Sequence, residues 1–96
     1  MGTFHQGKSE LHGITVVVET SLGDLYVGRC DDEDARGVIL LDADMHRKTD
    51  AMSRDEYLDR AVRFGVWNRL PRVELARSDV KSIRRLGDFE SSSAQG

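Results

Sequence analysis

Five stretches of the chain carry the apolar and β-branched residues that are typical of β-strands. They are residues 14–20, 25–30, 37–42, 72–76 and 81–86. The fourth stretch alternates cleanly, with Val73 and Leu75 on one side. The third is a continuous apolar run, which indicates burial on both faces, or one buried face and one face on a partner. Short connections between most of these stretches predict a small antiparallel β fold.

One helix is predicted between the third and fourth strands. Ser53 and Glu56 form a capping box, in which each side chain can bond a free amide at the helix start. Gly65 is a natural C-terminal cap. Four apolar side chains share one helical face: Tyr57, Leu58, Ala61 and Val62. This face predicts that the short helix docks on the sheet, because an isolated helix of this length is marginal in water.

Other short segments of the sequence predict a bend, two turns and a loop. Gly28 lies inside the second strand and predicts a bend or bulge there. Residues 31–34 are four adjacent carboxylates, which predict a solvated turn because such a group cannot be buried. Residues 43–52 lack a clean period and are interpreted as the frayed end of the third strand and a loop. Residues 77–80 predict a tight turn.

Composition limits the function classes that fit this chain. Its 96 residues make one domain at most, with little room for a buried cleft. No apolar stretch approaches the roughly 20 residues of a membrane helix, and the first residues do not resemble a signal peptide. We therefore expect a cytoplasmic protein without a membrane partner. The tail, residues 89–96, contains three consecutive serines and is predicted to be disordered.

The net charge of −3 conceals an asymmetry along the chain. Residues 1–59 hold 6 Lys and Arg against 13 Asp and Glu, whereas residues 60–96 hold 8 against 4. Such an asymmetry can mark a basic partner surface. Alternatively, both halves fold together and their charges intermix.

The sequence lacks the groupings that catalysis and metal binding require. The three histidines have no metal-ligand spacing, and no Ser-His-Asp grouping, phosphate loop or zinc signature is present. Cys30 is the single cysteine, which excludes an internal disulfide; a cysteine in a strand is usually a small core residue. We expect no enzyme activity, no cofactor and no metal.

Two segments of the sequence resemble the two motifs of Sm and Sm-like proteins. The first segment reads Gly13-x-x-Val16-x-Val18, then Gly23-x-x-Tyr26-x-Gly28 and Asp34, and the second Val73-x-Leu75-Ala76-Arg77-Ser78-Asp79-Val80-x-x-Ile83. The resemblance covers residues 13–44 and 71–86, about half of the chain. It implies a strongly bent five-stranded antiparallel barrel of the SH3-like, Sm type, formed by residues 1–88. The helix would lie in an insertion at about residues 45–70.

The resemblance also implies assembly into a homo-oligomeric ring. Sm-like proteins pair their fourth strand with the fifth strand of a neighbour, which leaves no unpaired edge. An alternative is that Lys81, Arg84 and Arg85 are charges that protect a free edge from pairing.

The family binds single-stranded RNA in two loops at the inner rim of the ring. The candidate RNA-binding residues carried over from it are Asp34, Arg36, Arg77 and Ser78. Arg36 stands at the base-stacking position, where a guanidinium plane can stack on a base. Val38 stands where the family has an asparagine, and Ser78 where it has a glycine, so part of the motif is missing.

Each of these residues also has a simpler interpretation. Arg36 and Arg77 can pair with the acidic stretch beside them, and Asp34 can bond local amides as a turn-former. Trp67 can complete the core of the barrel or lie on a partner surface. Two functions therefore remain open. One is an RNA-binding or RNA-chaperone ring, and the other is a non-catalytic scaffold or interaction module of the same fold.

Overall fold

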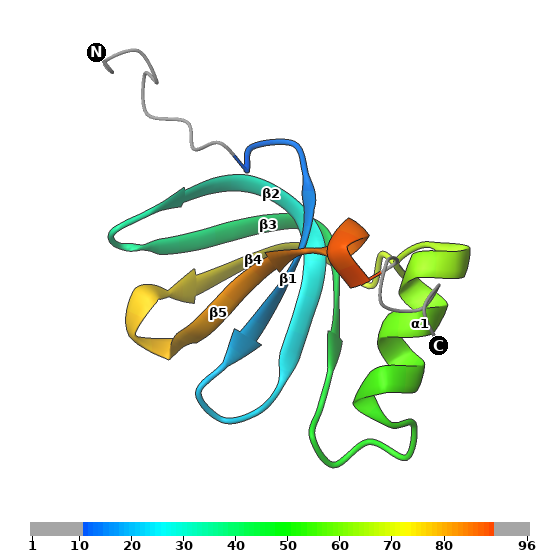
Figure 1. Cartoon of the computed structure of the whole chain (residues 1–96). Coiled ribbons are helices and arrows are strands. Elements are labelled where there is room, and N and C mark those ends of the chain that lie inside the picture. Colours follow the sequence, from blue (N-terminus) through cyan, green and yellow to red (C-terminus); the bar gives the residue numbers. More distant parts are fainter. Residues whose placement is uncertain (1–10, 90–96) are drawn as a thin grey trace.

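The computed structural model describes residues 11–89, and these form one antiparallel five-stranded sheet with an 11-residue helix beside it and a short helical segment at residues 86–89 (Figure 1). The strand order is β4-β3-β2-β1-β5. The elements are β1 (Thr15–Thr20), β2 (Leu25–Asp34), β3 (Gly37–His46), α1 (Arg54–Phe64), β4 (Leu70–Ala76), the short 3-10 helix η2 (Arg77–Asp79) and β5 (Val80–Arg85). The predicted mainly β fold with one inserted helix is confirmed. Of the predicted tail only Phe89 belongs to the described residues, and residues 90–96 lie outside them.

Strands β2 and β3 are longer than their hydrophobic patterns predict. The expected turn at residues 31–34 is wrong, because these residues continue β2 and pair with β3, for example Glu33 with Val38. Residues 43–46 likewise continue β3. Main-chain pairing does not require side-chain burial, so the carboxylates of Asp31–Asp34 stay half-buried or exposed while their backbone joins the ladder.

Strand β2 bends at Gly28, as predicted. The register with β3 shifts between Val27 and Arg29, which marks a bulge or irregularity at this glycine. A Cβ atom at position 28 would lie only 2.7 Å from the Cβ of Ala43. Glycine is therefore needed here because β3 passes too close for a side chain.

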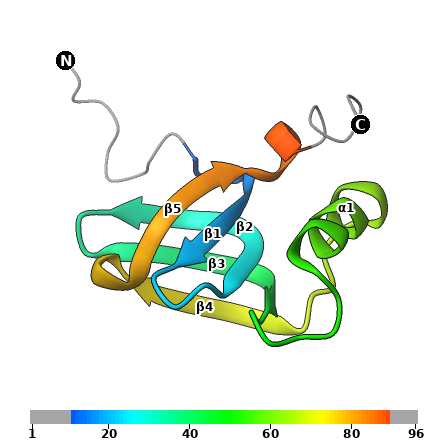
Figure 2. The ribbon, with the colours of Figure 1, turned by 60° about the horizontal axis from the view of Figure 1, so that its bottom comes forward.

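The connection between β4 and β5 forces the sheet to curl. These strands are the two edges, and in a flat sheet four spacings of about 4.8 Å would separate them by roughly 19 Å. The three residues of η2 join them, and a 3-10 helix rises only about 2 Å per residue. The sheet must therefore curl to bring the edges together at this end (Figure 2). Among residues 11–89 no pairing joins β4 to β5, so the sheet is not closed.

Both faces of the sheet carry an apolar core. The buried residues of the concave-face cluster are Val16, Val18, Cys30, Val38, Leu40 and Ala43. Partly buried side chains of β4 and β5, such as Val73 and Ile83, pack against this cluster from the two edges. The second cluster consists of Val17, Leu25, Val27, Tyr57 and Leu58, the last two from α1. Helix α1 therefore covers the face of the sheet that curling leaves open.

The predicted caps of α1 at Ser53 and Gly65 are confirmed, whereas the structure shows no return bond from the Glu56 carboxylate within residues 11–89. The Ser53 hydroxyl accepts a hydrogen bond from the Glu56 amide at 3.1 Å. At the other end, the Gly65 amide donates to the Ala61 carbonyl at 3.0 Å, and Gly65 has a φ of 91°. A positive φ is a conformation that glycine adopts without steric cost, so the chain can turn back toward β4 at this residue.

Candidate interaction sites

The two turns that carry the predicted RNA-binding residues meet in space. The Arg77 amide, in η2, donates to the Arg36 carbonyl in the β2–β3 turn at 2.9 Å. Asp34, Arg36 and Arg77 are therefore neighbours, as expected of a two-loop site. Ser78 follows in η2 and is exposed, with no side-chain hydrogen bond among the described residues.

Arg77 is engaged within its own chain. Its guanidinium donates to the carboxylate of Glu33 and, at 2.7 Å, to the carbonyl of Asp34. The sequence left two interpretations of Arg77 open, and this contact corresponds to the simpler one, in which a loop arginine pairs with the acidic stretch beside it. Arg77 therefore ties η2 to the end of β2, and its charge is largely balanced by Glu33.

Asp34 shapes the turn that follows it. Its carboxylate accepts hydrogen bonds from the amides of Arg36, at 2.8 Å, and Gly37, at 3.3 Å. The bond from the Arg36 amide is the main reason why the pKa of Asp34 is lowered from its ordinary value. The side chain of Arg36 is 93% exposed, and its guanidinium lies 3.8 Å from Asp34. Of the two arginines, Arg36 is thus the one that a ligand reaches more easily.

Val38, which stands where Sm-like proteins have an asparagine, lies in the core. Val38 is fully buried in the concave-face cluster, so it presents no side chain to the rim. The acidic residues Asp31–Asp34 outnumber the two arginines Arg36 and Arg77 around these turns. Phosphate neutralisation supplies much of RNA affinity, and this local balance does not favour it.

A second polar cluster lies between α1 and the sheet and was not predicted. Asp44 in β3 is 1% exposed, and its carboxylate accepts a hydrogen bond from the Tyr57 hydroxyl at 2.7 Å. Arg69 donates two bonds to the same carboxylate, from Nε at 2.6 Å and from Nη2 at 3.0 Å. The cluster joins β3, the helix and the segment before β4 through one buried carboxylate.

The pKa values of this cluster follow from its geometry. Burial raises the pKa of Asp44, but the hydrogen bonds from Arg69 and Tyr57 outweigh it, so the pKa lies below 3.8. Burial and the neighbouring Asp44 carboxylate both raise the pKa of Tyr57. The side-chain hydrogen bond to Asp44 raises the pKa of Arg69. At neutral pH the cluster is therefore an ionised pair whose carboxylate also accepts a hydrogen bond from a neutral phenol.

Trp67 does not complete the core of the curled sheet. Its side chain is 44% exposed and lies beside α1, 6.2 Å from the Tyr57 ring between centroids. The guanidinium groups of Arg60 and Arg69 lie over the indole at 5.3 and 5.4 Å. Of the two interpretations of Trp67, completion of the barrel core is wrong, because the residue packs against Tyr57 of α1 and stays partly exposed.

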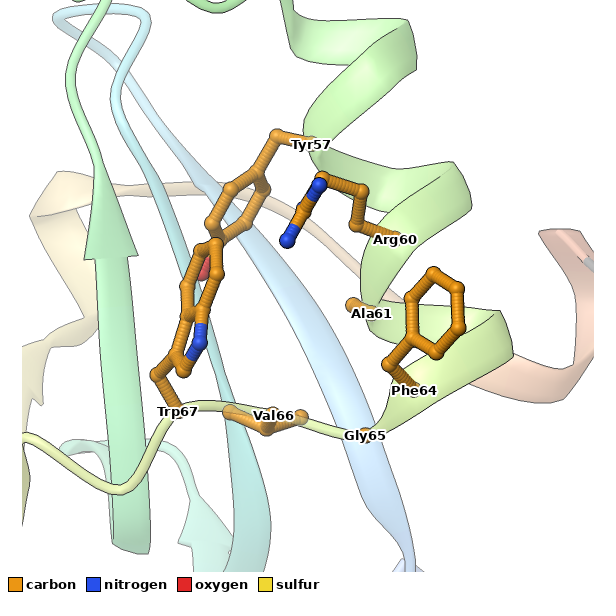
Figure 3. A pocket seen from close by; sticks show the side chains of 7 residues that line it. All are labelled: Tyr57, Arg60, Ala61, Phe64, Gly65, Val66 and Trp67. Atoms are coloured by element: carbon orange, nitrogen blue, oxygen red, sulfur yellow. The ribbon is translucent and has the colours of Figure 1, made fainter.

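A small pocket opens beside Trp67 (Figure 3). It has a volume of about 80 Å³ and is lined by Tyr57, Arg60, Ala61, Phe64, Gly65, Val66 and Trp67. Phe64 is 76% exposed, so two large aromatic side chains reach solvent at one end of α1. Figure 3 shows the Arg60 side chain between Trp67 and Phe64.

Residues 11–89 show neither a metal-binding group nor a membrane-spanning helix. No group of three His, Cys, Asp or Glu side chains there is arranged to hold a metal ion. No helix in this range is long and apolar enough to cross a membrane. Cys30 is buried in the concave-face cluster, as expected of a small core residue.

Comparison with known proteins supports the fold alone. No family model matches the chain, and no curated protein matches it. Among solved structures it is similar to a chain of the NatC complex bound to CoA, with 16% identity and a TM-score of 0.55. The match covers 85% of this chain and 87% of that chain.

Proposed function

We propose that this protein is a non-catalytic assembly module, an Sm-like subunit that joins copies of itself edge to edge. The observation that carries the proposal is the placement of β4 and β5. They are the two unpaired edges of one curled sheet, and they have similar lengths, Leu70–Ala76 and Val80–Arg85. An unpaired edge presents a row of backbone donors and acceptors that another strand can pair with.

Repetition of one such contact leads to a ring. Pairing β4 of one copy with β5 of the next is a head-to-tail contact, which closes when the rotation between copies divides a full turn. It would also extend each curled sheet by one strand on both sides. A ring satisfies every edge, whereas a single copy leaves two edges in water.

Two of the three basic residues of β5 contact groups of their own chain. Arg84 lies over the ring of Phe89, with its guanidinium carbon 4.3 Å from the centroid. Lys81 approaches Glu19 of the neighbouring strand, at 3.7 Å. Both cations are directed to groups of their own chain, which supports pairing of β5 over the alternative of a protected edge.

One substitution removes an edge donor without disturbing the sheet. The Arg77 amide points to β3, since it donates to the Arg36 carbonyl, and successive amides of an antiparallel strand point alternately to the two sides. The amide of Glu74, which is opposite Ile39, therefore points away from β3 to the open edge. Glu74→Pro deletes this donor, and Glu74→Ala keeps it.

Light scattering on the purified chain tests the proposal. We expect a mass that is a multiple of 10.8 kDa for the protein and for Glu74→Ala, and a monomer for Glu74→Pro with an unchanged circular dichroism spectrum. A monomeric protein at about 100 μM, far above the Kd of a stable assembly, contradicts the proposal. An assembly that survives Glu74→Pro contradicts the edge contact specifically.

RNA binding is the second candidate, because one observation favours it. Arg36 is almost fully exposed at the tip of the β2–β3 turn and would be repeated in every copy of a ring. Titration of short U-rich and A-rich RNA at two salt concentrations tests this role. Binding that weakens with salt and is lost in Arg36→Ala supports it. No binding at low salt, where the phosphate contribution is strongest, excludes it.

A further inference from the structure

We propose that the pocket between Phe64 and Trp67 is a docking site for an acidic, apolar segment of a partner protein. This inference is independent of the edge contact. The pocket lies at the α1 end of the molecule, whereas the β2–β3 turn and η2 lie at the opposite end in both ribbon views (Figures 1 and 2). The protein would therefore have two separate interaction surfaces.

The residue types around the pocket are those of interaction hot spots. Phe64 and Trp67 are two of the three large apolar side chains that are strongly exposed among residues 11–89. Tryptophan and arginine are enriched where a few residues carry most of the binding energy. Here Phe64, Trp67 and Arg60 surround one concavity, whereas Leu22, the third exposed residue, lies on the β1–β2 turn.

The pocket is held in shape before any partner arrives. The Tyr57 hydroxyl and the Arg69 guanidinium are both fixed by the buried Asp44 carboxylate. Tyr57 lines the pocket, and Arg69 lies over the Trp67 indole. Binding at a preformed site costs less ordering entropy, so even a small contact yields measurable affinity.

The charge of the side chains around the pocket indicates which kind of partner segment would bind there. Arg63 pairs with Asp59 at 3.1 Å, and Arg69 pairs with Asp44. Arg60 makes no ion pair among residues 11–89, and its guanidinium lies over the rings of Phe64 and Trp67 instead. The pocket therefore carries one unbalanced positive charge, which a carboxylate beside the inserted apolar side chain would neutralise.

The size of the pocket favours a protein side chain over a nucleobase. Its volume of about 80 Å³ is roughly half of the 150 Å³ cavity that holds benzene in a protein core. An aliphatic side chain fits this space better than a purine ring. Phe64 and Trp67, which both line the pocket, would then contact the inserted chain.

The single tryptophan provides a direct assay, because Trp67 emission reports on the pocket itself. The probe is a short synthetic peptide with leucines at helical spacing between glutamates. The same peptide with lysines and a U-rich oligonucleotide serve for comparison. We expect a saturable blue shift with the glutamate peptide, with a Kd between about 1 and 100 μM, and a weaker shift at high salt.

Charge reversal identifies the contact. Arg60→Glu should weaken binding at least tenfold, and Phe64→Ala, which removes an exposed ring, should weaken it without unfolding the protein. Arg47→Glu makes the same change in net charge in the loop before α1 and should alter affinity less than twofold. The proposal is overturned by any of three results: no saturation up to about 1 mM glutamate peptide, equal losses in Arg60→Glu and Arg47→Glu, or a Trp67 response to RNA alone.

Discussion

Replacement of Asp44 by asparagine tests whether the buried carboxylate is what holds α1 on the sheet. The amide would keep the shape of the side chain but lose the charge that Arg69 and Tyr57 share. Breaking a buried pair by removing one partner costs about 3–5 kcal/mol. Arg69 is largely exposed and can turn to water, which reduces this figure, so we expect a loss of about 2–4 kcal/mol.

This loss should be measured by urea unfolding, with Trp67 fluorescence and circular dichroism as probes. A lower midpoint with an unchanged m value indicates lost stability and not a changed denatured state. All variants are compared at one protein concentration, since assembly adds to apparent stability by mass action. The matched control is Asp42→Asn, two residues away, because Asp42 pairs with Arg29 at 3.2 Å on the surface and should cost less than about 1 kcal/mol.

The effect of Asp44 should also depend on pH in one direction. Its pKa is lower in the folded protein than in the unfolded chain, so its stabilisation is complete above about pH 4. As the pH falls through the folded pKa, the carboxylate is protonated and the stabilisation disappears. The difference between the protein and Asp44→Asn should therefore shrink below pH 4. If both asparagine variants lose the same stability at pH 7, the buried pair does not hold the helix.

Three further predictions concern the fold and the two turns that carry Arg36 and Arg77. Gly28→Val should lower stability by about 2–3 kcal/mol in thermal unfolding, because its Cβ would lie 2.7 Å from that of Ala43; a neutral result would refute the close approach. Ser53→Ala should cost about 1 kcal/mol in helix stability, and Ser53→Asp should restore it. Arg77→Ala should destabilise the protein by about 1 kcal/mol in urea, whereas Arg36→Ala should stay within about 0.5 kcal/mol; equal effects would show that Arg77 does not tie the turns.

Local signals predicted the elements of this fold well. The helix ends follow from Ser53 and Gly65, because a cap acts on amides within one turn of itself. The bend at Gly28 was also predictable from the sequence, since a glycine inside a strand often marks a bulge or the close approach of another backbone. The end of β2 was not predictable from the sequence. The four charged side chains of residues 31–34 predicted a turn, but the backbone of this segment pairs with β3 although these side chains are not buried.

The site was predictable only in part. The two turns were identified from the resemblance to Sm-like proteins, and the structure brings Asp34, Arg36 and Arg77 together. The salt bridge of Asp44 was not identified, because residues 43–52 were interpreted as the frayed end of a strand and a loop. Its partner Arg69 is 25 residues away, and no local rule connects the two. The position of Trp67 was not predictable for a related reason. Tryptophan side chains are largely buried on average, but the sequence does not show against which surface they pack.

The pairing of β5 with β1 has a consequence for synthesis of the chain. Val16 in the first strand pairs with Arg85, close to the end of the described residues. During translation the hairpins of β1, β2 and β3 can form early, but the outer edge of β1 stays unpaired until β5 has left the ribosome. A nascent chain stalled within the helix would expose that apolar edge to other chains. The last strand made therefore protects the first from aggregation.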